Sequence, residues 1–163
     1  MNGLLKIPMQ LIILFIGVMV FVFYQFNTPP IFFNKVELNN IKSSNYFEEV
    51  NNLENEFKVL HDKKTVDIYS LLDAQKNEDK GRVQELKRSV LSIESKMHEI
   101  NNNVKTIVIK NNPSAETNDK DYIFMSYVID YLPTGIIGLL FAVMFCAAMS
   151  STASELNALA STT

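Results

Sequence analysis

The sequence has few of the residues that form disulfides or bind metal ions in small domains, namely one cysteine and two histidines, and it has no tryptophan. Cys146 has no second cysteine with which to form a disulfide within the chain. Together with the distant His61 and His98 it cannot supply the ligand cluster of a structural metal site. A formal net charge of −3 excludes the basic surface that nucleic-acid binding needs, so we expect no nucleic-acid partner.

Charge is absent from two long segments of the chain. No charged residue occurs in the 28 residues 7–34 or in the 24 residues 131–154, whereas 30 of the 33 charged side chains lie between Lys35 and Asp121. A helix of about 20 apolar residues crosses a bilayer. The sequence therefore predicts an all-α membrane protein in which two transmembrane helices flank a water-facing module.

The ends of the first span indicate its orientation. We expect this helix to begin near Pro8, since proline is tolerated in a first helical turn, and to stop before Pro29 and Pro30. The apolar run is too long for the core of a signal peptide, so we expect it to be retained. Two spans place both chain ends on one side of the membrane, and Lys6 favours the cytoplasmic side.

The central module shows the apolar spacing of packed helices. Spacings that alternate between three and four residues predict a helix with a narrow coiled-coil seam. The positions are Tyr46, Val50, Leu53, Phe57 and Leu60, then Val83, Leu86, Val90, Ile93, Met97, Ile100, Val104 and Ile107. A polar turn at 76–81 separates the two series. We expect an antiparallel helical hairpin of about 45–74 on 82–108, with both histidines solvated.

The resulting plan has five parts. Residues 1–6 form a cytoplasmic end, 7–28 a transmembrane helix and 29–121 an extracytoplasmic loop that contains the hairpin. A short loop helix follows at 122–132, and 133–163 form a second, truncated transmembrane helix. The loop 29–132 then lies outside a multi-pass protein of the plasma or inner membrane.

The second span carries a stripe of small and hydroxyl-bearing residues. Their spacings of three, four and seven place them on one helical face. They are Ala147, Ser150, Ser151, Ser154, Asn157, Ala158 and Ser161. Such a stripe lets another helix pack closely, or it offers oxygen ligands to an alkali cation that partner helices would complete. Glu155, close to the stripe, either pairs at the inner interface or takes part in transport.

The second span resembles one family at several fixed positions. Pro133, Gly135, Gly138 and Leu139 form P-x-G-x-x-G-L, and Ala147-Ala148-Met149-Ser150-Ser151 and Ser154-Glu155-Leu156-Asn157 follow in order. This combination resembles the sodium:solute symporter family. The segments Lys6 to Gly17, Phe23 to Phe26 and Pro29 to Asn34 are similar to the span that precedes this motif in the family.

The resemblance implies a leucine-transporter-like core of two inverted repeats, in which these spans would be the seventh and eighth helices. By position, the Ala147 carbonyl and the Ser150 and Ser151 hydroxyls would bind sodium as the coupling ion. It further implies a transporter rather than an enzyme, without cofactors, that imports a small organic solute. Its partners would be membrane lipid, sodium, the solute and the remaining helices, so we expect the chain to be a fragment of a longer protein.

A different class of protein has the same outline. A two-span bacterial receptor places a helical sensor domain of roughly 85 residues between its spans, and the hairpin would suit a dimeric four-helix sensor. Against this interpretation, the residues given after the second span form no signalling domain, and such a receptor needs no hydroxyl-lined stripe. A structural membrane spacer without a ligand is a third interpretation.

The heptad spacing yields a test of the hairpin by itself. A peptide of residues 45–108 should be strongly helical in water, because its two apolar seams bury each other. Far-ultraviolet circular dichroism measures this directly. A coil-like spectrum would refute the predicted hairpin.

Overall fold

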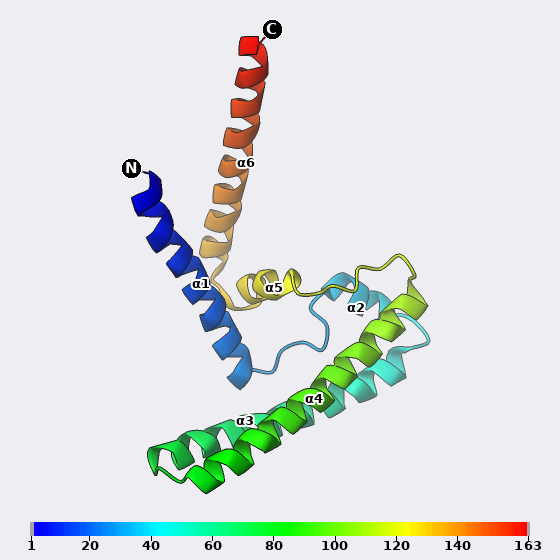
Figure 1. The fold of residues 1–163 in the computed structure, drawn as a ribbon. Helices are drawn as coiled ribbons and strands as arrows, with labels where there is room; N and C mark the ends of the chain where they lie inside the picture. The colour runs from blue at the N-terminus through cyan, green and yellow to red at the C-terminus, as the bar shows by residue number, and fades with distance from the viewer. Residues whose placement is uncertain (1, 163) are drawn as a thin grey trace. The chain divides into compact units, whose positions relative to one another are not determined.

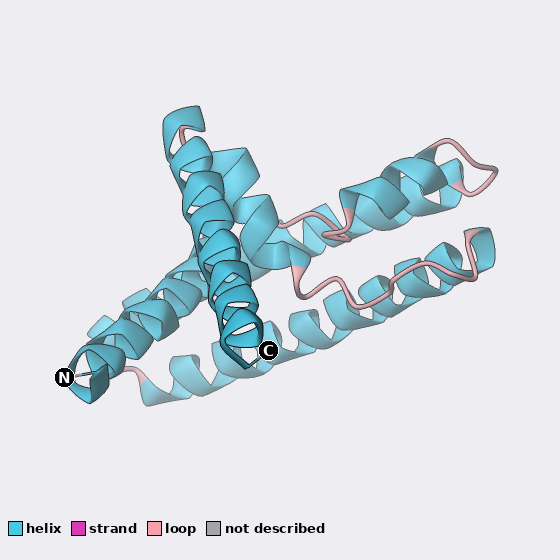
Figure 2. Cartoon of the chain, turned by 90° about the horizontal axis from the view of Figure 1, so that it is seen from above, coloured by secondary structure: helices cyan, strands magenta, loops and turns pink. Residues whose placement is uncertain are grey.

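The structure, a computed structural model, describes the backbone of residues 2–162 and the side chains of residues 6–161. Within these residues every element of regular structure is a helix, which confirms the all-α class (Figures 1 and 2). The chain divides into two compact units, Met1–Ile123 and Phe124–Thr163. The helices are α1 (Asn2–Phe26), α2 (Lys35–Lys42), α3 (Phe47–Lys76), α4 (Lys80–Asn111), α5 (Tyr122–Tyr131) and α6 (Thr134–Thr162).

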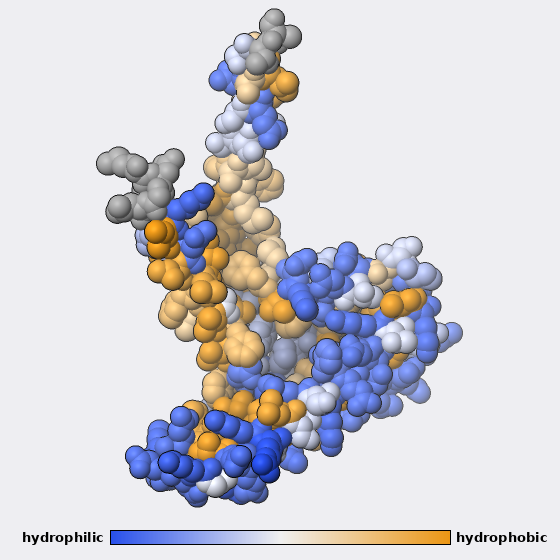
Figure 3. Space-filling view, viewed as in Figure 1, coloured by the Kyte–Doolittle hydropathy of each residue, from blue (hydrophilic) through white to orange (hydrophobic). Residues whose placement is uncertain are grey.

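Two of the helices are long and apolar enough to cross a membrane. They comprise Lys6–Phe26 of α1, with 21 residues, and Thr134–Ser161 of α6, with 28 residues. At 1.5 Å per residue these lengths are about 32 and 42 Å, against a hydrocarbon core of about 30 Å. Apolar side chains cover the surface of α1 and of the first part of α6, whereas most of the hairpin surface is hydrophilic (Figure 3).

Helix α1 begins earlier than the sequence predicts. It starts at Asn2 rather than near Pro8, so the proline lies inside the helix. Proline there removes one backbone hydrogen bond, and the helix on either side tolerates this loss. The helix ends at Phe26, just before the Thr28-Pro29-Pro30 segment, and the Asn27 backbone and side-chain nitrogens both donate to the Phe23 carbonyl at 3.0 Å.

The central loop contains the predicted hairpin, with α3 shifted by two residues and α4 longer than predicted. Helices α3 and α4 pack against each other along their length (Figure 1). Every position of the two predicted seams is buried or half-buried. The heptad spacing therefore located the contact between the helices, although their ends lie two or three residues from the predicted ones.

The turn of the hairpin is tighter than the expected stretch 76–81. Only Asn77, Glu78 and Asp79 lie between the helices, and Glu78 takes a left-handed conformation with φ 55°. The Glu78 and Asp79 amides donate to the carbonyls of Gln75 and Ala74, at 3.3 and 3.0 Å, as in a Schellman motif. Asp79 then accepts a 3.0 Å bond from the Arg82 amide and caps α4.

A short helix absent from the prediction covers one end of the hairpin. Asn34 caps α2 by accepting a 3.3 Å bond from the Glu37 amide. The buried side chains of Leu38 and Ile41 then join the hairpin core. That core consists of Ile31, Phe32, Leu38, Ile41, Val50, Phe57, Ile93, Met97, Ile100, Val104, Ile107 and Val108.

The segment after α4 is fixed by one buried carboxylate. Asp119 is 9 % exposed, accepts a 3.1 Å bond from the Phe33 amide and lies 3.4 Å from the Lys105 ammonium. A paired and hydrogen-bonded charge is the form in which a carboxylate is tolerated in an interior. Asp119 thereby joins the chain that follows α4 to the chain that follows α1.

The second unit consists mainly of α5 and α6. The Leu132 amide donates to the Val128 carbonyl at 3.2 Å, and the Ile136 amide donates to the Pro133 carbonyl at 2.9 Å, so Pro133 lies between two helical ends. Side chains of both helices line a small apolar cavity of about 40 Å³, among them Val128 and Leu140. These boundaries lie within one residue of those predicted.

The packing predicts a strong difference between two isoleucines of α4. Ile107→Ala should lower the free energy of unfolding by about 2–5 kcal/mol, because it leaves a cavity at a side chain that is 2 % exposed. Urea unfolding in detergent micelles, followed by circular dichroism, measures the change. The matched variant Ile109→Ala, at a side chain that is 49 % exposed, should change it by under about 0.5 kcal/mol. Equal effects would contradict the described core.

Candidate functional site

The predicted sodium ligands lie on one face of α6. Ala147, Ser150 and Ser151 are all exposed, and at 100° per residue Ser150 lies about 60° to one side of Ala147 and Ser151 about 40° to the other. A backbone carbonyl and two hydroxyls are thus presented within one turn. These are the oxygen ligands that a hard cation prefers.

Hydrogen bonding divides the hydroxyls of α6 into two kinds. Thr152 and Ser154 donate to the carbonyls of Ala148 and Ser150, both at 2.9 Å, and so bind to their own helix. Among the described residues, none is hydrogen-bonded to the hydroxyl of Ser150 or of Ser151. Both hydroxyls can therefore turn a lone pair toward an ion or a neighbouring helix.

Glu155 lies one turn after Ser151 on α6. The helix continues beyond it to Thr162, and the side chain is exposed, with no ion pair to any described residue. At 100° per residue it lies about 40° from Ser151, beside the serine stripe. A carboxylate in this place would add negative charge next to the three predicted oxygen ligands.

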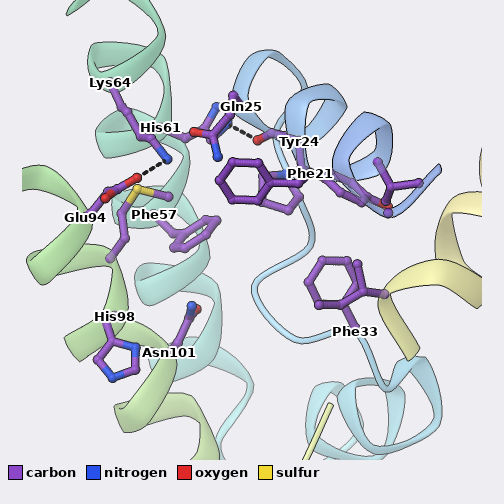
Figure 4. A pocket seen from close by; sticks show the side chains of 15 residues that line it. Phe21, Tyr24, Gln25, Phe33, Phe57, His61, Lys64, Glu94, His98 and Asn101 are labelled. Atoms are coloured by element: carbon purple, nitrogen blue, oxygen red, sulfur yellow. Dashed lines mark hydrogen bonds and ion pairs between the residues drawn. The ribbon is translucent and has the colours of Figure 1, made fainter. Parts of the chain in front are cut away.

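A second group of polar contacts lies where α3 meets the end of α1. His61 is 1 % exposed, although the sequence predicted a solvated side chain, and that prediction is wrong. Its Nε2 lies 3.2 Å from the Tyr24 carbonyl oxygen and its Nδ1 lies 3.3 Å from the Thr28 hydroxyl. The imidazole therefore bridges the last turn of α1 and the segment that follows (Figure 4).

The Tyr24 carbonyl determines which imidazole nitrogen carries the proton. A carbonyl oxygen only accepts, so Nε2 of His61 is the donor, and in the neutral ring Nδ1 accepts from the Thr28 hydroxyl. The last four carbonyls of a helix have no partner within it. Thr65 supplies another donor, because its hydroxyl lies 3.3 Å from the Gln25 carbonyl and 3.0 Å from that of His61.

A pocket of about 440 Å³ lies beside these contacts, between α1 and the hairpin. Its wall is mostly apolar and contains the rings of Phe21, Phe33 and Phe57. Figure 4 shows Phe21 and Phe33 on one side and the side chains of α3 and α4 on the other. The residues of the wall that carry polar groups are Tyr24, Gln25, His61, Lys64, Glu94, His98 and Asn101.

Two of these polar groups form a largely buried ion pair. The Lys64 ammonium lies 3.0 Å from the Glu94 carboxylate, and their side chains are 8 % and 44 % exposed. Burial of Lys64 is tolerable because Glu94 balances its charge. Neither residue is one of the predicted seam positions. Lys64 nevertheless continues the heptad series, four residues after Leu60, whereas the other lysines of α3 do not.

Comparison with known proteins adds no relative. The chain matches no protein-family model, no curated protein and no solved structure. The described residues also contain no group of three or more histidine, cysteine, aspartate or glutamate side chains that could hold a metal ion. The resemblance to sodium:solute symporters therefore rests on the residues of the two apolar segments alone.

The contacts of His61 predict a specific loss of stability. His61→Leu removes the donor to the Tyr24 carbonyl and should lower the free energy of unfolding by about 1–3 kcal/mol. It should also speed protease cleavage in residues 27–34. Urea unfolding and limited proteolysis in micelles measure the two effects. His98→Leu, the same change at an exposed histidine, should leave both nearly unchanged, and matching effects would refute the bridging role.

Proposed function

We propose that this chain supplies two membrane-spanning helices and an extracytoplasmic helical loop to a sodium-coupled importer of an organic solute. The observation that carries the proposal is the arrangement on α6. The Ala147 carbonyl and the Ser150 and Ser151 hydroxyls share one exposed face, at the positions where the resemblance places sodium ligands. Both α1 and α6 are long and apolar enough to serve as spans.

In this proposal α6 contributes one side of the ion site. Two hydroxyls and one carbonyl do not complete the shell of six or so oxygens that a hard cation takes, so the other ligands come from a helix outside this chain. Sodium then bridges α6 to that helix and favours the arrangement in which the solute site faces outward. Binding of the solute, rocking of the repeats and loss of sodium to the cytoplasm complete the cycle.

The hairpin has a separate place in this proposal. With the chain ends cytoplasmic, as Lys6 favours, residues 29–132 lie outside the cell. Helices α3 and α4 then form a water-facing arm that begins at the outer end of α1. The charged, hydrophilic surface of these helices suits that location.

Removal of one hydroxyl tests the ion site. Ser151→Ala should raise the sodium concentration for half-maximal binding about tenfold. It removes one oxygen ligand, and we take its contribution to be about that of one hydrogen bond. The measurement is binding of radioactive sodium to membranes of cells that express the transporter containing this chain. Thr152→Val is the matched control, since the Thr152 hydroxyl already binds the Ala148 carbonyl, and it should leave binding unchanged.

The possible outcomes separate the interpretations. Weakened binding in Ser151→Ala alone supports the ion site. Equal sodium affinity in the unaltered protein and in Ser151→Ala would remove the ligand role of Ser151 and with it the observation on which the transporter proposal rests. A two-span receptor with a helical sensor domain would then explain the chain better.

A further inference from the structure

The pocket beside α1 extends across two depths of the membrane if α1 is a span. Gly17 and Phe21 line one part of it, and Gln25, in the last turn of the helix, lines another. Gly17 and Gln25 are eight residues apart, which is about 12 Å along the helix. The pocket thus reaches from hydrocarbon depth to the interface where α1 ends, and an occupant meets an apolar environment first and a polar one afterwards.

The charges at the polar part of the pocket sum to zero. Lys64 and Glu94 form its one ion pair among the described residues, at 3.0 Å, and the remaining polar wall consists of amide, imidazole and phenol groups. Glu94 keeps nearly half of its side chain exposed and can accept further hydrogen bonds. A neutral but dipolar wall of this kind suits a zwitterion better than an anion.

One acceptor in the wall requires a donor from outside the described residues. The Oδ1 atom of Asn101 is buried, and no described residue donates to it. A buried acceptor without a hydrogen bond is unfavourable, so a ligand that brings an N–H or O–H group to this atom is bound more tightly. Phe21, Phe33 and Phe57 nearby offer ring faces, which attract a cation.

We propose that this pocket binds a phospholipid whose zwitterionic headgroup carries a primary ammonium, as in phosphatidylethanolamine. The ammonium donates to Asn101 Oδ1, and the phosphate pairs with Lys64. The start of an acyl chain lies along Gly17 and Phe21. The inference rests on α1 being a membrane span, which belongs to the proposed function, and it does not depend on sodium.

Headgroup chemistry gives the proposal its selectivity. A choline headgroup has the same charges but no N–H, so it leaves Asn101 Oδ1 without a donor. A glycerol headgroup has hydroxyl donors but a net negative charge, which Glu94 repels and Lys64 attracts only after losing its partner. Phosphatidylethanolamine should therefore bind about tenfold better than either, a preference equal to one charge-assisted hydrogen bond.

The experiment is competition among the three lipids for the full chain. The chain is purified in a mild detergent, mixed with equal amounts of phosphatidylethanolamine, phosphatidylcholine and phosphatidylglycerol, and the retained lipids are counted by native mass spectrometry. Asn101→Leu should reduce the preference for ethanolamine over choline to about one. Asn102→Leu, the same change at the exposed neighbouring residue, should keep it.

A third variant tests the charge argument with the opposite expectation. Glu94→Gln leaves Lys64 without its carboxylate, so phosphatidylglycerol should then be retained better than phosphatidylethanolamine. Circular dichroism of each variant checks that its helix content is unchanged. Equal retention of ethanolamine and choline lipids, a preference of the unaltered chain for phosphatidylglycerol, no retained lipid at all, or equal effects of the two leucine variants would each overturn the proposal. None of these results bears on the sodium ligands of α6.

Discussion

The carbonyl oxygens at the end of α1 impose the constraint around which the first unit is organised. A helix that leaves an apolar environment exposes four carbonyls, and here α3 supplies donors to two of them through His61 and Thr65. The Thr28-Pro29-Pro30 segment cannot continue the helix, so the donors have to come from elsewhere in the chain. A polar hairpin is thereby fixed to an apolar helix by a few short contacts, while the hairpin's own stability comes from its separate apolar seam.

Features with a regular period were predictable from the sequence. Long uncharged runs gave the two membrane-compatible helices, and alternating spacings of three and four residues gave the faces of α3 and α4 that touch. Both signals depend on the amount of apolar surface that a segment must hide, which a sequence states directly. The stripe of Ala147, Ser150 and Ser151 belongs to the same category, because helical geometry alone places these residues on one face. Whether they bind an ion depends on ligands from other helices, which the residues of this stripe cannot predict.

Features that depend on contacts between distant segments were missed. His61 reads as one more polar residue of an amphipathic helix, and only the approach of α1 buries it. The turn was predicted over residues 76–81, yet only three residues lie between the helices and Glu78 alone takes the left-handed conformation. The start of helix α2 could have been predicted from local sequence, because Asn34 followed three residues later by Glu37 is an ordinary N-terminal capping pattern.

The place at which α3 is attached to α1 has a mechanical consequence. His61 lies near the middle of α3, so the helix extends about equally far on both sides of its attachment to α1. From His61 to Lys76 there are 15 residues, or about 22 Å of helix. A tilt of α1 by a tenth of a radian would swing that end of the hairpin by about 2 Å, and the opposite end the other way. The hairpin thus turns a small change in the angle of a membrane helix into a displacement in water, where a partner or an inserted label can register it.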